Sequence, residues 1–294
     1  MFASTVKHLL HCALFLSIIS WLVYNTQKVQ AGHVNSWLEY GTAFSVFLIA
    51  NRVIVLLAVP QMLFNFLGLI FYNAFPKKVV LAGSPLLAPF ICVRVVTRGD
   101  YPDLVKKNVL RHVNTCLAVG LEHFSVEVVT DKAIEIPKHR RIREVVVPED
   151  YDTKTGAMFK SRALQYCLED SVNVLNPNDW IVHVDEETIL TENCVRGIVN
   201  FVFDGKYPFG QGLITYANEN VVNWYTTLAD SLRVSEDMGK LRFQFKTFHK
   251  PLFSWKGSYV VTQVRNSRFL FVSSIINRTF TASRGTRCFF RQRR

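Results

Sequence analysis

Two long apolar runs stand at the start of the chain. Leu9 to Val23 is almost continuously apolar, and Val53 to Tyr72 consists mostly of Leu, Val, Ile and Phe, interrupted by Pro60, Gln61 and Asn65. A helix needs about 20 apolar residues to cross a bilayer, so the first run must borrow flanking residues. The second run shows no polar stripe of the kind that marks a soluble core helix. The pattern predicts two transmembrane helices within residues 1–76, and a cleaved signal peptide is the alternative for the first.

The charges that flank these runs predict a topology. Lys7 precedes the first run, and Lys77 and Lys78 follow the second, whereas the segment between them is less basic. Positive residues favour the cytosolic side of a membrane. We therefore expect a multi-pass endomembrane protein whose two ends, and the domain after residue 77, face the cytosol.

Residues 77–264 alternate short apolar runs with amphipathic ones. The spacing predicts strands over residues 90–97, 124–130, 144–148 and 180–184, and helices over 104–119 and 159–168. Strands that alternate with helices indicate an α/β domain with a mostly parallel sheet. Ligands of such sheets bind beyond the carboxyl ends of the strands.

Three consecutive carboxylates, Asp185, Glu186 and Glu187, directly follow the last of these strands. Carboxylates so crowded repel one another unless a cation neutralises them. Asp185 and Glu187 lie two residues apart and can point the same way in extended chain. Mg²⁺ and Mn²⁺ bind one or two such carboxylates together with a diphosphate. We predict a metal site here, the alternative being an acidic surface turn that caps a helix from Thr188.

The net charge of +11 does not indicate a nucleic-acid partner. Eight arginines and no acidic residue lie in residues 265–294, so the basicity belongs mainly to this tail. No basic face with base-reading elements is visible in the rest of the chain. The six cysteines are scattered without a CxxC pair, which is typical of free thiols in a reducing compartment.

Several motifs occur in an order known from one enzyme family. They are Thr97-Arg98-Gly99-Asp100, Thr130-Asp131, Lys160-Ser161-Arg162, and His183 to Thr188. Over residues 1–264 the chain resembles the inverting glycosyltransferases of the GT-A fold, the family of cellulose synthases and dolichol-phosphate mannose synthases. Within that family it is most similar to animal β-1,4-mannosyltransferases of glycosphingolipid synthesis.

The resemblance implies a function and a set of site residues. It implies inverting transfer of mannose from GDP-mannose to glucosylceramide, a lipid acceptor that would explain the membrane anchor. Arg98, Asp131, Lys160 and Arg162 would then contact the nucleotide-sugar. Asp185 and Glu187 would bind Mn²⁺ or Mg²⁺ and the diphosphate, and the strand that holds Gly257 and Ser258 would border the acceptor.

The chain departs from the family pattern after residue 264. The family carries its catalytic base in a Glu-Asp pair after the Gly-Ser strand and then has a Gln-x-x-Arg-Trp motif, and neither is present here. We therefore expect an incomplete GT-A domain at 77–264, an atypical tail at 265–294 from an alternative exon or intron read-through, and impaired transfer. The alternatives are an inactive or regulatory form that binds nucleotide-sugar, another membrane glycosyltransferase of this fold, or a membrane scaffold without chemistry.

Overall fold

The computed structural model describes residues 2–29, 36–75, 78–153, 156–215 and 223–267. Contacts between residues divide the chain into two compact units. The first, here the helical unit, joins Met1–Lys77 with Thr215–Phe253, and the second, here the sheet unit, joins Lys78–Ile214 with Ser254–Arg294. The atypical tail lies outside the described residues from 268 onward, and the domain boundaries at 77 and 264 stay a prediction.

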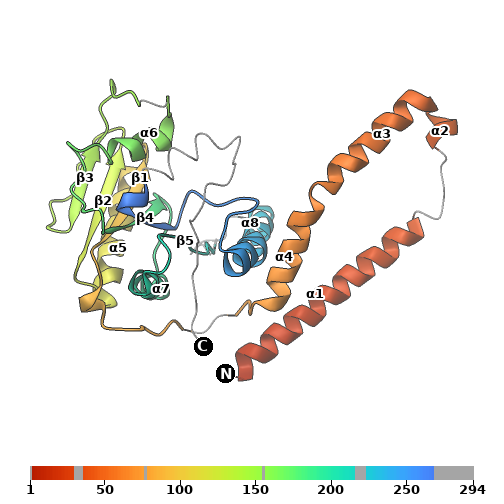
Figure 1. The fold of residues 1–294 in the computed structure, drawn as a ribbon, viewed down its shortest axis with the longest axis horizontal. Coiled ribbons are helices and arrows are strands. Elements are labelled where there is room, and N and C mark those ends of the chain that lie inside the picture. The colour runs from red at the N-terminus through yellow and green to blue at the C-terminus, as the bar shows by residue number, and fades with distance from the viewer. Residues whose placement is uncertain (1, 30–35, 76–77, 154–155, 216–222, 268–294) are drawn as a thin grey trace. The chain divides into compact units, whose positions relative to one another are not determined.

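The sheet unit is built on a six-stranded mixed sheet with the strand order β3-β2-β1-β4-β6-β5 (Figure 1). The first four strands of this order run parallel, β6 is antiparallel to β4, and β5 is antiparallel to β6. The strands are β1 (Ile91–Thr97), β2 (Phe124–Thr130), β3 (Ile142–Val146), β4 (Trp180–Asp185), β5 (Phe209–Gln211) and β6 (Val260–Gln263). The helices are η1 (Pro85–Leu87), α5 (Pro102–Ala118), α6 (Phe159–Tyr166) and α7 (Glu192–Asp204).

Helices cover both faces of this sheet because its strands are apolar on both sides. Every residue of β1 is buried, which explains why its sequence shows no alternation. Val93 and Val95 share a core with α5 and α7, whereas Val96 packs with Ala163 and Leu164 of α6. The predicted parallel strands are confirmed, although β3 begins two residues before the expected position.

A row of polar side chains crosses the α6 face of the sheet. The strand register aligns Arg143, Glu127, Arg94 and His183 on β3, β2, β1 and β4, respectively. Arg94 and Glu127 are buried, and the Arg94 Nε lies 2.6 Å from the Glu127 Oε1. Arg143 completes the row with a contact of 3.2 Å to the other Glu127 oxygen. The core on this face therefore contains paired charged side chains as well as apolar groups.

The prediction of free cysteines is confirmed for the five that the structure describes. Cys92, Cys116 and Cys167 are buried in the sheet unit, and burial raises the pKa of each thiol to about 12. These thiols are protonated at neutral pH and pack as small apolar groups.

The helical unit contains α1 (Phe2–Val29), α2 (Ser36–Glu39), α3 (Gly41–Leu56), α4 (Val59–Phe71) and α8 (Trp224–Glu236), followed by the π-helical turns η2 (Asp237–Leu241) and η3 (Gln244–Phe248). Among the described residues one helix, over Ala3–Asn25, is long and apolar enough to cross a membrane. Its first half lies beside α4, where His8 and Cys12 contact the Ile70 carbonyl and the Phe15 ring lies 5.5 Å from the Phe66 ring.

The second apolar run is not one continuous helix. It is divided at Leu57 and Ala58, and Pro60 stands in the first turn of α4, where its missing N–H leaves no intrahelical bond unmade. The two resulting apolar helices are each shorter than a span. The second transmembrane crossing therefore stays a prediction.

Two of the polar interruptions of this run, Gln61 and Asn65, have partners in the fold. Gln61, Asn65 and Gly68 follow helical spacing on α4 and form the side that packs against η2. Gln61 accepts a hydrogen bond from the Lys240 Nζ, and Asn65 accepts one from the Lys240 backbone N–H, both at 3.1 Å. A Cβ at Gly68 would lie 2.0 Å from the Gly239 carbonyl oxygen, so the two helices touch through backbone. Two polar residues and one glycine of this otherwise apolar run therefore form its contact with η2.

Candidate active site at the carboxyl edge of the sheet

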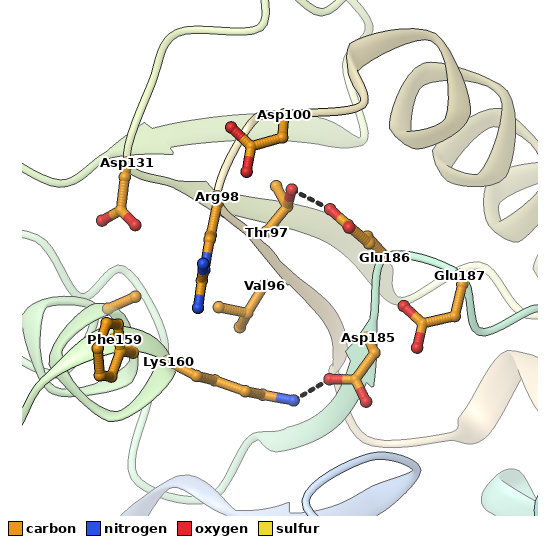
Figure 2. Close-up of a pocket in the computed structure, with 11 residues that line it drawn as sticks. Val96, Thr97, Arg98, Asp100, Asp131, Phe159, Lys160, Asp185, Glu186 and Glu187 are labelled. Atoms are coloured by element: carbon orange, nitrogen blue, oxygen red, sulfur yellow. Dashed lines mark hydrogen bonds and ion pairs between the residues drawn. The ribbon is translucent and has the colours of Figure 1, made fainter.

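The parallel strands β1, β2 and β4 end at one edge of the sheet, where the loops after them and the first turns of α6 border an open cavity of about 230 Å³ (Figure 2). Five of the predicted site residues line it: Arg98, Asp131, Lys160, Asp185 and Glu187. They come from four separate segments of the chain. The rule that ligands bind beyond the carboxyl ends of parallel strands thus describes this cavity.

The side chains of the three consecutive acidic residues at the end of β4 do not point in one direction. Glu186 turns back and accepts a hydrogen bond from the Thr97 hydroxyl, whereas Asp185 and Glu187 lie on the other side of the loop (Figure 2). No group of three His, Cys, Asp or Glu side chains that could hold a metal occurs among the described residues. A divalent cation here would have at most two protein carboxylates and would take its remaining ligands from water or phosphate, which suits Mg²⁺ or Mn²⁺.

Neighbouring segments hold this acidic loop in place. The Asn108 amide of α5 donates a hydrogen bond to the Glu186 carbonyl at 2.8 Å. One helical turn later, His112 is buried beside the Thr188 backbone, and burial lowers its pKa to about 4, so it is neutral at pH 7. From the opposite side, the Ser258 hydroxyl accepts the Asp185 backbone N–H and contacts the Thr188 hydroxyl, both at 3.0 Å. These contacts hold the loop from two sides.

Lys160 reaches across the cavity from α6 to Asp185. Its Nζ is bonded to the Asp185 carboxylate (Figure 2). The same Nζ lies 3.2 Å from the Gly257 carbonyl oxygen. Arg98 instead stacks over the Phe159 ring at 5.4 Å, and no carboxylate in the described part of the chain pairs with it. The cavity therefore holds one cation that is neutralised and one that is available to an anion.

Arg162 and Asp131 form an ion pair with 3.1 Å between Nη1 and Oδ1. The Arg162 Nε also donates to the Tyr151 carbonyl at 2.9 Å, which ties the loop after β3 to α6. Arg162 is absent from the cavity lining. Its visible role is to position Asp131, and direct contact with a nucleotide-sugar stays a prediction.

The expectation of a Gly-Ser strand is wrong. Gly257 and Ser258 lie in the loop before β6, which begins at Val260. Tyr259, between them and the strand, has a φ of 54°, a left-handed conformation that is rare for an aromatic residue. Phe159 beside Lys160 has a similar φ of 53°. Two segments of the site thus carry backbone strain, as is common at ligand sites.

Sequence reasoning missed the supporting residues of the site. Asn108 and His112 stand at i and i+4 in a helix whose other buried positions are mostly apolar. Polar residues at buried positions of an amphipathic helix were the available signal, because buried polar groups normally require partners. The bond between Thr97 and Glu186 left no such signal, since it joins residues 89 positions apart.

The chain is similar in sequence to known glycosyltransferases. Residues 180–281 match the family described as glycosyl transferase family group 2. The chain is 69% identical over 270 residues to the β-1,4-mannosyltransferase egh of Drosophila melanogaster, and 57% identical over 268 residues to the β-1,4-mannosyltransferase bre-3 of Caenorhabditis elegans. Each match covers 90% of this chain and 59% of the relative, so the chain spans less than two thirds of the length of these proteins.

One solved structure is similar at low sequence identity. It is the mannosyltransferase PcManGT from Pyrobaculum calidifontis in complex with GDP-Man and Mn²⁺, matched with 14% identity and a TM-score of 0.45 over 81% of this chain and 65% of that chain.

Proposed function

We propose that the chain, which is 69% and 57% identical to the egh and bre-3 β-1,4-mannosyltransferases, carries the donor-binding part of a membrane-anchored mannosyltransferase. The donor is GDP-mannose, and the sheet unit is a GT-A-type nucleotide-diphosphosugar domain. The observation that supports this most directly is the combination of Asp185, Glu187, Arg98 and Lys160 around one cavity at the carboxyl edge of the sheet. Both signs of charge are needed there to bind a metal–diphosphate group.

Each charged group has a place in this proposal. Asp185 and Glu187 hold Mn²⁺ or Mg²⁺, whose chemistry is to neutralise the leaving diphosphate. Arg98 binds a phosphate oxygen, because its guanidinium presents several donors and has no carboxylate partner among the described residues. Asp131, held by Arg162, faces the cavity and contacts the nucleotide base.

The acceptor in this proposal is glucosylceramide, and its β-1,4-mannosylation belongs to glycosphingolipid synthesis. A two-chain lipid stays in the bilayer, so an enzyme that uses it gains from an anchor such as the Ala3–Asn25 helix. The Gly257–Ser258 loop would border this acceptor, because it is hydrogen-bonded to Lys160 and Asp185, two residues that line the cavity. The endomembrane location and cytosolic domain belong to the same proposal.

Asp185→Asn tests the donor site. We expect it to lower the affinity for GDP-mannose in the presence of Mn²⁺ by at least about a hundredfold, because it removes a metal-ligating charge while keeping the shape. Calorimetric titration of the full chain in detergent measures this. Glu192→Gln is the control, since it removes the same charge from an exposed position on α7. Unchanged binding by the Asp185 variant would refute the assignment.

A second candidate function is nucleotide-sugar binding without transfer. It is favoured by the site itself, in which all the charged residues assigned above serve the donor. Transfer of radiolabelled mannose to glucosylceramide in detergent separates the two functions. Label in the lipid fraction supports the transferase, and donor binding without label supports the alternative.

A further inference from the structure

We propose that Lys160 occupies the place of the divalent cation in the ligand-free protein, and that the donor diphosphate draws it away so that metal and donor bind together. This inference rests on the proposed function, because it concerns how the same site is loaded. We call Lys160 the latch, because in the ligand-free protein it connects the metal position at Asp185 with the loop at Gly257.

Lys160 already occupies the carboxylate that a metal ion would need. Its ammonium group is bonded to the Asp185 carboxylate, and Figure 2 shows the side chain extended across the cavity to reach it. Among the described residues, no other cation contacts the Asp185 carboxylate. A metal ion that takes Asp185 as a ligand must therefore displace an ion pair that is already formed.

The Lys160–Asp185 ion pair is exposed enough for other ions to replace it. Both side chains of the pair are about one third exposed, at 33% for Lys160 and 35% for Asp185, so neither charge is trapped in the core. Lys160 has a flexible four-carbon stem and binds phosphate as a point charge. When a diphosphate enters the cavity, the ammonium can move to it while a metal ion replaces it at Asp185.

The same lysine also joins two strained segments. It follows Phe159, and its second partner, the Gly257 carbonyl, lies two residues before Tyr259, and both aromatic residues have left-handed φ values. Such conformations persist only where the surrounding structure holds them. Release of Lys160 removes the bond between these segments, so loading of the donor is transmitted to the loop on the other side of the cavity.

The latch has a thermodynamic signature. In the ligand-free protein, a metal ion competes with a positive charge that is bonded to its own ligand, so metal alone binds weakly. If the donor removes that charge, metal and donor each strengthen the binding of the other by the same factor. Loss of the charge by mutation should therefore raise the affinity for metal in the absence of donor.

The test uses Mn²⁺ alone, with the free ion measured by electron paramagnetic resonance. We expect Lys160→Gln to bind Mn²⁺ about fivefold more tightly than the unchanged chain, which is the upper end of what an ion pair exposed to solvent contributes. Lys160→Arg should show no gain, because it keeps the positive charge. In the double variant Lys160→Gln with Asp185→Asn the gain should disappear.

Lys132→Gln is the matched control. Lys132 pairs with Asp100 at 2.9 Å on another side of the cavity, and its removal changes the net charge equally without touching Asp185. A gain in Lys132→Gln as large as that in Lys160→Gln would reduce the effect to net charge and overturn the latch. Equal Mn²⁺ affinity of Lys160→Gln and the unchanged chain would also overturn it.

Donor binding separates this failure from failure of the proposed function. If the unchanged chain binds GDP-mannose with Mn²⁺ while Lys160→Gln shows no gain for Mn²⁺ alone, the latch is wrong and the function stands. If the unchanged chain does not bind GDP-mannose with Mn²⁺, the function is refuted and the latch falls with it.

Discussion

Arg94 shows how much one side chain can depend on a single partner. Its Nη atoms have no hydrogen-bond partner among the described residues, so the buried guanidinium relies on its Nε bond to Glu127. A buried charge without compensation is among the most destabilising groups in a protein. Glu127 in turn serves two arginines, since it also contacts Arg143.

Glu127→Ala should therefore lower the free energy of unfolding by about 3–5 kcal/mol, because it leaves the Arg94 charge buried and unpaired. Urea unfolding of the full chain, followed by circular dichroism, measures the loss. Glu122→Ala is the control, since the Glu122–Arg141 pair is half exposed at its carboxylate and such pairs contribute about 1 kcal/mol or less. Similar losses in the two variants would show that the polar row is not coupled as described.

Part of the site could be read from single residues, and part could not. Asp185 stands out because it follows a buried strand, and the same holds for Arg98 and Asp131. Arg94 and His183 each look like one isolated polar residue within an apolar strand. Which residues they face on the neighbouring strands depends on strand register, and the sequence of one strand does not contain that information.

At the level of elements, strands were predicted better than helix contacts. β1, β2 and β4 are buried on both faces, so their composition alone identifies them. The packing of α4 on η2 was not foreseen, because its partners are separated by more than 160 positions and the contact is made through glycine backbone.

Gly239→Ala should disrupt this crossing and destabilise the helical unit by about 2 kcal/mol or more, since the added Cβ would lie 2.1 Å from the Asn65 Oδ1 and 2.5 Å from its backbone oxygen. Limited proteolysis and urea unfolding both report the change. Gly197→Ala is the matched control: it is also helical, a Cβ there meets nothing within 4 Å, and alanine favours the helix by up to about 1 kcal/mol. Equal stability of the two variants would contradict the close crossing.

At the scale of the whole molecule, the apolar helices should keep the chain in a membrane. Leu14 and Ile18 of α1 are 63% and 49% exposed, so they do not maintain its packing. We expect the unchanged chain to remain in the pellet after alkaline carbonate washing. Its release would contradict membrane anchoring.

The same assay distinguishes one anchor from two. Leu14→Arg with Ile18→Arg places two charges in α1, each of which opposes insertion by about 2.5–3.5 kcal/mol. If the α3–α4 segment forms the second predicted span, this variant stays in the pellet. Release of the variant alone would mean that α1 is the sole anchor, and would refute the prediction of two spans.

The helical unit is assembled from two stretches of chain, so one stretch is synthesised well before the other. α4 leaves the ribosome long before η2, because all the residues from Lys78 to Ile214 are translated between the two stretches. At about 5–20 residues per second, the interval is on the order of ten seconds. Throughout it, Gln61 and Asn65 present polar groups on an apolar helix without the lysine that later binds them. The nascent chain therefore passes through a stage in which an insertion factor or a quality-control protein can recognise α4. Synthesis of η2 ends that stage, because its lysine then binds Gln61 and Asn65.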